Sequence, residues 1–289
     1  MRRAWRIARR SVVGFYRDQA THHAAALTYY ALMSLFPTLL LAVSLLGVLG
    51  QFPDTYDAIA SHLKGVVPAV TLAPLQTGVR AALRDRGTAA AALVLASVTA
   101  LYGGVGYLEA ARRALNVVFE VRRGRSFVRR KLTDVASLLV LLALVLTTLV
   151  LMFAGGDVAR RVLGSDVADV WRVARWPGAF ATALVVFSFV YHVTPDLGHR
   201  AVRQVMPGAL AGVGAWLAVS AAFSEYLAHF GSFNVTYGSF AAAIILLVWL
   251  WLTNLALLFG AEINAAIEHE HQAVAGRPEA AAPALAPPS

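Results

Sequence analysis

The sequence contains no cysteine among its 289 residues, and it has few charged side chains. Without cysteine the chain can form no disulfide, no thiolate metal site and no thiol nucleophile, although this identifies no compartment. Only 14% of the residues are charged, whereas 58% are hydrophobic, which is more apolar surface than one soluble core can hide. The composition therefore indicates a protein whose solvent is lipid.

Long stretches without charged residues recur along the chain. A hydrocarbon layer about 30 Å thick requires roughly 20 helical residues. The first such stretch is longer than this and contains Pro37, which favours a tilted or kinked helix. We predict an all-α, polytopic transmembrane bundle with six spans, at residues 24–52, 88–108, 135–153, 176–193, 207–224 and 239–260.

The lysines and arginines are shared unevenly between the connections of these spans. Seventeen of the 25 fall on the side that carries the N-terminus, and eight fall on the other side. Positively charged segments resist translocation and stay in the cytoplasm. The asymmetry predicts that both termini are cytoplasmic, in a bacterial-type inner (plasma) membrane.

Three regions follow from this pattern. Residues 1–23 form a basic cytoplasmic segment, residues 24–267 form the six-helix membrane domain, and residues 268–289 form an Ala- and Pro-rich tail that we predict to be disordered. In the connection 53–87, apolar residues recur at helical spacing with arginines between them. This connection is predicted to hold an amphipathic helix at the outer surface.

Four blocks of sequence occur in a characteristic order. They are AAALTYYALMSLFP at 24–37, LYGGVGYLEAARRALNVVFE at 101–120, PGAL at 207–210 and TYGSFAAAIILLVWLWLTNLALLFGAEINA at 236–265. The chain thereby resembles, over residues 16–267, the YihY/BrkB family of inner-membrane proteins, which was long mislabelled as ribonuclease BN. Some members are associated with serum resistance and one with lipid export, so the resemblance implies transport or lipid translocation.

Polar side chains in the first span should face protein or water, not lipid. Tyr30, Ser34 and Pro37 share one face of that helix, next to Tyr29. This stripe predicts either a kinked helix that lines a substrate cavity or a hydrogen-bonded seam between helices. In the first case Ser34 would hydrogen-bond the backbone groups that Pro37 frees.

The fifth and sixth spans add polar groups to this candidate substrate path. Glu225 and His229 stand at i, i+4, which predicts either a proton relay or a solvated helix end. Asn254 is the most deeply placed amide of the sixth span and should be hydrogen-bonded to a neighbouring helix. The glycines at 103, 104 and 106 and the pair at 208 and 212 predict close helix packing, or a hinge at the first three.

A second candidate cluster lies where the second and sixth spans reach the cytoplasm. Helical spacing brings Glu109 next to Arg112 and Arg113. We expect Glu262 to pair with one of these arginines, because a carboxylate at the edge of the hydrocarbon layer is costly unless it is neutralised. The cluster is predicted to be an inner gate, an anionic head-group site or a structural ion pair, and consists of Glu109, Arg112, Arg113, Asn116, Glu262 and Asn264.

The sequence predicts no catalytic residue, no metal site and no cofactor. The eight histidines are scattered, and no aspartate-rich metal motif or phosphate-binding loop accompanies them. The basic connection at 122–131 is expected to bind anionic lipid head groups and not nucleic acid. Two functions remain open, a transporter and a non-transporting scaffold for envelope assembly, and the partner could be a second copy of the chain or an envelope-assembly protein.

Overall fold

The computed structural model describes residues 2–48, 86–121, 134–144, 147, 165–195, 202–229 and 241–274. Within these residues all regular structure is helical, which confirms the all-α prediction for this part of the chain. A short apolar helix covers Asp134–Leu144. The long helices are α1 (Arg2–Arg17), α2 (Ala20–Val48), α5 (Arg86–Val118), α8 (Ser165–Val193), α9 (Val202–His229) and α11 (Ala241–Val274).

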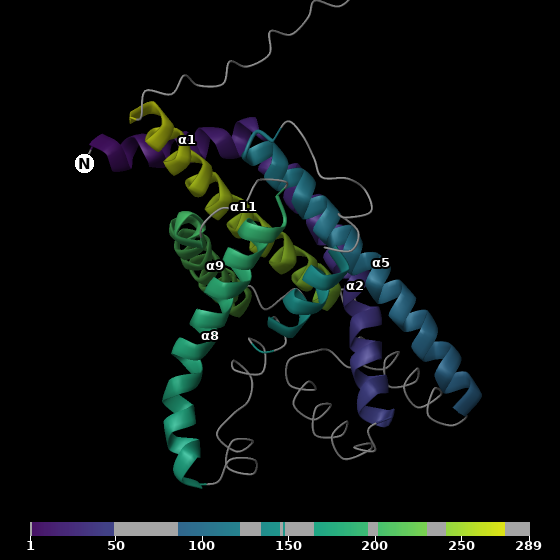
Figure 1. The fold of residues 1–289 in the computed structure, drawn as a ribbon. Coiled ribbons are helices and arrows are strands. Elements are labelled where there is room, and N and C mark those ends of the chain that lie inside the picture. The colour runs from purple at the N-terminus through teal and green to yellow at the C-terminus, as the bar shows by residue number, and fades with distance from the viewer. Residues whose placement is uncertain are drawn as a thin grey trace, which may run out of the picture.

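The helix α1 lies across one end of the bundle, and the other long helices extend away from it (Figure 1). The most extensive contacts join α2 with α5 and α9 with α11. The helix α11 also packs against α1 and α2, and α8 packs against α9. α11 is therefore the element that connects the two helix pairs with each other and with α1.

Three of the described helices contain segments that are long and apolar enough to cross a membrane. These segments lie in α8, α9 and α11 and correspond to the predicted fourth, fifth and sixth spans. The helices α2 and α5 cover the predicted first and second spans, and Asp134–Leu144 covers the beginning of the third. Six crossings with both termini in the cytoplasm stay a prediction.

Two predicted boundaries change. Residues 268–274 were predicted to belong to a disordered tail, but α11 continues as a helix to Val274 because no glycine or proline interrupts the sequence between Gly260 and Gly276. The remaining tail, 275–289, lies outside the described residues. The predicted outer amphipathic helix at 53–87 also lies outside them, except that residues 86 and 87 begin α5.

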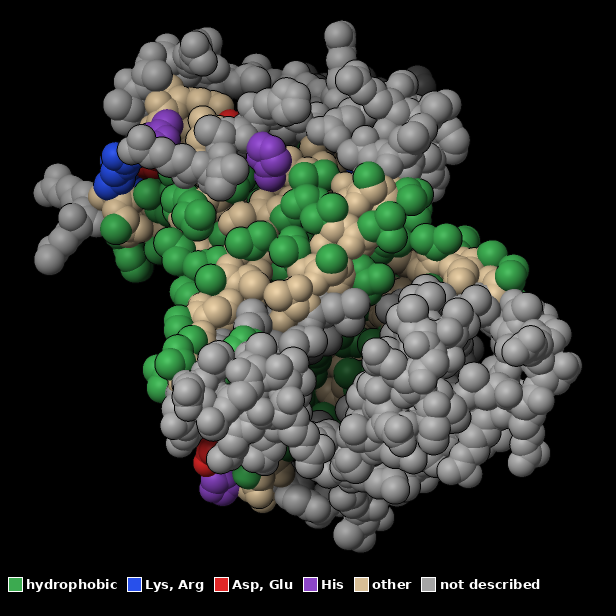
Figure 2. Space-filling view, turned by 60° about the horizontal axis from the view of Figure 1, so that its bottom comes forward, with side chains coloured by type: hydrophobic (Ala, Val, Ile, Leu, Met, Phe, Trp, Pro, Cys, Tyr) green, Lys and Arg blue, Asp and Glu red, His purple; other side chains and the backbone are tan. Residues whose placement is uncertain are grey.

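Much of the described surface is apolar. On α5, Val94, Val98 and Leu101 are exposed at helical spacing and form a stripe with Leu95 and Tyr102. Figure 2 shows hydrophobic side chains over the middle of the visible face, while the few visible charged and histidine side chains lie above and below them. An exposed apolar surface of this kind is suited to contact with lipid acyl chains.

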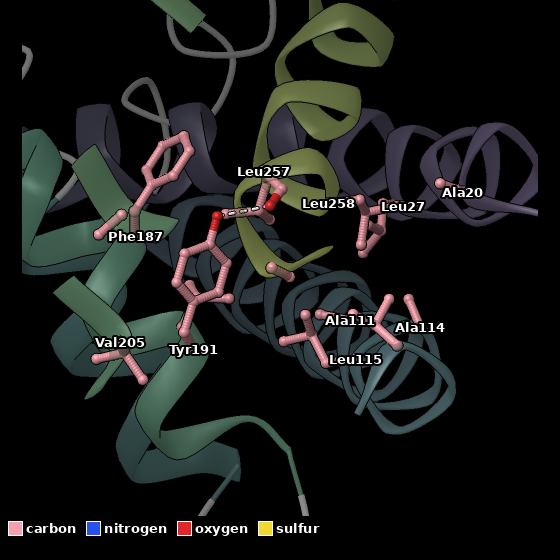
Figure 3. Packing of buried hydrophobic residues seen from close by; sticks show 14 of the residues in the cluster. Ala20, Leu27, Ala111, Ala114, Leu115, Phe187, Tyr191, Val205, Leu257 and Leu258 are labelled. Carbon is pink, nitrogen blue, oxygen red and sulfur yellow. Dashed lines mark hydrogen bonds between the residues drawn. The ribbon is translucent and has the colours of Figure 1, made fainter. Parts of the chain in front are cut away.

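The buried core lies where the helices cross. Leu27 of α2 and Leu115 of α5 are fully enclosed on one side, and Tyr191 of α8 and Val205 of α9 on the other (Figure 3). Leu258 of α11 is buried in the same cluster. The core therefore extends through both helix pairs.

Two residues with left-handed backbone conformation set the ends of helices at the α1 end of the bundle. Gln19 has φ of 52° and separates α1 from α2. Glu120 has φ of 53° and follows α5, whose end is closed by hydrogen bonds from Glu120 N to Val117 O and from Val121 N to Asn116 O. Together these two bonds form the Schellman arrangement, which satisfies the last carbonyls of a helix.

Candidate functional site: a polar pocket between α1 and α11

The N-terminal segment, predicted only as a basic stretch, is an amphipathic helix. Trp5, Val12 and Tyr16 are exposed and lie on one side of α1 at helical spacing. Ser11 and Gly14 lie on a different side, buried toward the bundle. A helix with exposed apolar residues and a row of arginines is typical of the membrane–water interface. The alternation of arginine and apolar residues in the sequence was the signal that could have revealed it.

An open pocket of about 420 Å³ lies between α1 and α11. We call it the arginine pocket, because arginine side chains line its α1 wall. Glu262, Glu270 and His269 of α11 line the opposite wall. Its lining consists of Trp5, Arg6, Arg9, Arg10, Val13, Gly14, Arg17, Val118, Glu262, Ala265, Ala266, His269 and Glu270.

Arg6 and Arg17 of this pocket are held by carboxylates. Arg6 contacts both carboxylate oxygens of Glu270, with Nε to Oε1 at 2.9 Å and Nη2 to Oε2 at 3.1 Å. Arg17 contacts Asp18 through Nε and Oδ1 at 2.7 Å, and Glu120 through Nη2 and Oε1 at 3.3 Å. The hydrogen bond to Asp18 raises the pKa of Arg17 above its usual range. These pairs join α1 to α11 and to the end of α5.

Glu262 lies in the α11 wall of the arginine pocket and not beside the arginines predicted for it. Its side chain is buried and packs against Gly14, where an added Cβ would overlap the carboxylate. The hydroxyl of Ser11 donates to the backbone carbonyl of Ile7 at 2.9 Å and lies 3.5 Å from that of Glu262. The prediction that Glu262 pairs with Arg112 or Arg113 is wrong, because α1 fills the space in front of it.

Arg112 instead pairs with Asp134, at the start of the short apolar helix, and both side chains are buried. Glu109 lies 3.1 Å from Arg112 and 3.4 Å from Arg113, as the helical spacing predicted. The sequence analysis missed Asp134. A carboxylate directly before the apolar stretch at 135–153 was the available signal, since it requires a partner.

The polar stripe of α2 packs against α5. Tyr30 lies over Gly106 and Ser34 over Gly103, while Gly104 receives Leu138. The three glycines lie within one continuous helix, so they serve close packing and not a break in α5. This is the arrangement of the predicted seam.

One detail of the stripe was predicted incorrectly. The Ser34 hydroxyl donates to the carbonyl of Ala31 at 3.0 Å. Pro37 leaves the carbonyl of Met33 without its helical partner. Ser34 therefore does not bond the group that the proline frees. Tyr29 is exposed and contacts Tyr30 edge to face, and Pro37 is half-buried within α2.

Asn254 joins three helices, as expected for a buried amide. Its Oδ1 accepts from the hydroxyl of Tyr107 at 3.0 Å, and its Nδ2 donates to Thr28 at 3.1 Å. Thr28 in turn donates to the carbonyl of Ala24 at 2.7 Å. Because these groups bond to one another, they form a polar link between α2, α5 and α11.

The helices α9 and α11 cross at a contact that we call the glycine seam, formed by Gly208, Gly260 and Asn264. An added Cβ on either glycine would overlap the backbone carbonyl of the other. The amide of Asn264 accepts from Gly208 N at 2.7 Å and donates to Val205 O at 2.9 Å. The sequence blocks PGAL and GAEIN therefore meet in space.

The seam is extended by a tyrosine that the sequence analysis did not select. Tyr191 of α8 is fully buried, and its hydroxyl donates to the carbonyl of Leu257 at 2.5 Å. Figure 3 shows this bond reaching from α8 to α11. Tyr191 also fills the space beside Gly212 and Gly260, where the absence of a glycine side chain leaves room for its large ring.

Glu225 and His229 lie at the exposed end of α9. Their side chains are 3.2 Å apart, with exposed fractions of 74% and 70%. This is the solvated helix end, one of the two predicted alternatives. Asn116 is half-buried near the end of α5. In the part of the chain that the structure describes, no group of three or more potential ligands could hold a metal ion.

Helices of this length with exposed apolar faces define an α-helical membrane protein. The chain belongs to the BrkB/YihY family, since the family described as virulence factor BrkB matches residues 11–284. The ribonuclease-like protein YfkH of Bacillus subtilis is 30% identical, over 84% of this chain and 88% of its own.

Two further relatives are named UPF0761 membrane proteins. That of Xanthomonas campestris strain B100 is 28% identical over 86% of this chain, and that of Chromohalobacter salexigens is 29% identical over 84%. The chain spans 57% and 58% of the length of these two proteins. No solved structure matches the chain.

Proposed function

We propose that this protein is an integral protein of the bacterial inner membrane, with six spans and both termini in the cytoplasm, and that it moves a lipid or lipid-linked envelope component. The arginine pocket is the observation that carries this proposal. It opens beside the exposed apolar side chains of α1, at the end of the bundle that the charge asymmetry predicts to be cytoplasmic.

Two features support a role in handling lipids. Trp5 and Tyr16 of α1 are suited to the head-group level of a membrane, where aromatic side chains gather. The pocket begins directly beside Trp5, so a molecule held there would keep its polar part among arginines and its apolar part in lipid. Family members named as membrane proteins are in keeping with this location.

Reconstitution into liposomes tests the transport proposal. The full chain is incorporated with fluorescent analogues of phosphatidylglycerol, phosphatidylethanolamine and a polyprenyl-linked sugar, and dithionite is added to quench the outer leaflet. We expect faster loss of fluorescence than in liposomes that carry a heat-inactivated sample. No acceleration with any of the lipids would overturn the proposal.

The absence of cysteine provides a test of the topology. Single Ser→Cys substitutions at Ser126 and Ser289 should react with a membrane-impermeant maleimide only after the membrane is opened. Those at Ser61 and Ser232 should react in intact spheroplasts. Labelling of Ser126→Cys in intact spheroplasts would contradict cytoplasmic termini.

A non-transporting scaffold is the second candidate, and the packing of the polar stripes favours it. Tyr30 and Ser34 fill the space at glycines of α5, and Asn254 is bonded on both sides, so these groups act as links between helices. A scaffold predicts that purification in mild detergent recovers a partner in fixed stoichiometry. A protein purified alone, with lipid flux, would count against it.

We also propose that the protein has no catalytic activity, including ribonuclease activity. The scattered histidines of the sequence support this, because hydrolysis of RNA needs convergent acid, base or metal groups. The test is incubation of the purified protein with RNA. Cleavage that disappears in an Arg113→Gln or Glu262→Gln variant would contradict the proposal.

A further inference from the structure

The side chains that line the arginine pocket carry more positive than negative charge. Four arginines line it, against two carboxylates, Glu262 and Glu270. Glu270 is engaged by Arg6, and the nearby Asp18 and Glu120 are engaged by Arg17. In the described part of the chain no carboxylate pairs with Arg9, whose side chain is exposed. A ligand for this pocket should therefore be an anion.

The arginines form a single face of α1. At 100° per residue, Arg6, Arg10 and Arg17 point within about 40° of one another, and Arg9 lies between them and the apolar stripe of Trp5. This places a row of guanidinium groups directly beside side chains that are suited to lipid. The planar fork of donors in guanidinium matches the oxygens of phosphate.

The α11 wall is shaped to leave this row accessible. Ala265 and Ala266 present only methyl groups to the pocket, and Gly14 lets the Glu262 carboxylate lie directly against α1. Only 4% of Glu262 is exposed, so its charge is largely withdrawn from a ligand. Arg6 is held by Glu270 and Arg17 by Glu120, and these pairs hold α1 in place beside the opening.

We propose that the arginine pocket binds the phosphate of an anionic lipid head group, with Arg9 as its principal donor. The lipid is favoured over a free phosphate compound because Trp5, which lines the pocket, belongs to the exposed apolar stripe with Val12 and Tyr16. Basic pockets beside membrane helices on the cytoplasmic side are suited to such head groups. This inference names the ligand for the pocket on which the proposed function rests.

The test uses the full chain purified in mild detergent. Cardiolipin or phosphatidylglycerol is titrated and binding is followed by native mass spectrometry, with phosphatidylcholine as the uncharged reference. Arg9→Gln should weaken binding of the anionic lipids about fivefold, because one charge near such a surface is worth that factor. Arg3→Gln is the matched control, since Arg3 lies on the same helix outside the pocket and should change the affinity less than twofold.

A second variant changes the affinity in the opposite direction. Glu270→Gln releases Arg6 from its carboxylate, so binding of the anionic lipid should become about fivefold tighter. A folding defect cannot mimic this gain. Equal affinities of wild type, Arg9→Gln and Glu270→Gln would overturn the proposal, as would equal binding of phosphatidylcholine.

Inorganic phosphate and glycerol 3-phosphate serve as soluble competitors in the last part of the experiment. They should displace the lipid only weakly, because they lack the acyl chains that contact the apolar stripe. Displacement at the same concentration as a soluble short-chain phosphatidylglycerol would assign the pocket to a soluble phosphate compound and overturn the lipid proposal. Lipid binding without flux in liposomes would support this inference and reject transport. Lipid flux that is unchanged in Arg9→Gln would support transport and reject this inference.

Discussion

The helix α11 presents two different faces to its neighbours between Gly260 and Glu270. On one face, Gly260 and Asn264 meet α9 in the glycine seam, where backbones touch and both ends of the amide are bonded. On the other face, Glu262 and Glu270 meet α1 across the open arginine pocket. Glu262 and Asn264, only two positions apart on one helix, thus lie on opposite sides, one at the pocket and one in a packed contact.

The difference follows from what fills the space between the helices. In the seam, the missing side chains of glycine let carbonyl groups and an asparagine occupy the contact directly. At the pocket, α1 meets α11 at Ser11 and Gly14, and beside this contact an arginine side chain reaches across the opening, where Arg6 meets Glu270. We therefore expect stability to depend on the seam and ligand binding to depend on the pocket.

The largest effect should come from adding one methyl group to the seam. Gly208→Ala places a Cβ against the carbonyl of Gly260 and the side chain of Asn264, which can give way only if the helices separate. We expect a loss of about 3 kcal/mol in the free energy of unfolding. Unfolding by sodium dodecyl sulfate, followed by far-UV circular dichroism, measures it.

Substitutions of two other glycines serve as comparisons for the loss of stability expected at Gly208. Gly214→Ala, on the same helix, meets no atom within 4 Å and should change stability by less than about 1 kcal/mol, toward greater stability. Gly14→Ala meets only the end of the flexible Glu262 side chain, so its effect should be smaller than that of Gly208→Ala. Equal losses at Gly208 and Gly14 would erase the distinction between the two faces.

A smaller loss is expected when the amide of the seam is removed. Asn264→Leu leaves the groups at Gly208 N and Val205 O without their side-chain partner and should lower the free energy of unfolding by about 1–2 kcal/mol. The same unfolding measurement applies. Gln272→Leu, at the exposed end of α11, is the control and should leave stability unchanged.

The smallest effect on stability should arise at the pocket. The Arg6 side chain is 62% exposed, so breaking its pair through Glu270→Gln should cost no more than about 1 kcal/mol. The cost should shrink further as salt is added, because exposed charges are screened. A loss as large as that of Asn264→Leu would mean that the pocket is part of the structural core.

Sequence pattern predicted the helices better than it predicted their contacts. Charge-free stretches located five helices that the structure describes over much or all of their length, and helical spacing predicted the contacts of Glu109 with Arg112 and Arg113. It did not reveal α1 as a helix, and it ended α11 too early. Basic residues and polar ends lack the hydropathy signal on which such predictions depend.

The sequence by itself determined that this protein belongs in a membrane, that it is helical, and which polar residues could not face lipid, because these properties follow from hydropathy and spacing along one chain. Only the tertiary structure decided the partners of those residues. In the structure Asp134 pairs with Arg112, Glu262 packs against Gly14, and Asn264 forms hydrogen bonds with α9. The reason is that each of these contacts spans different helices, and the crossing of helices depends on shape at the contact and not on any local pattern.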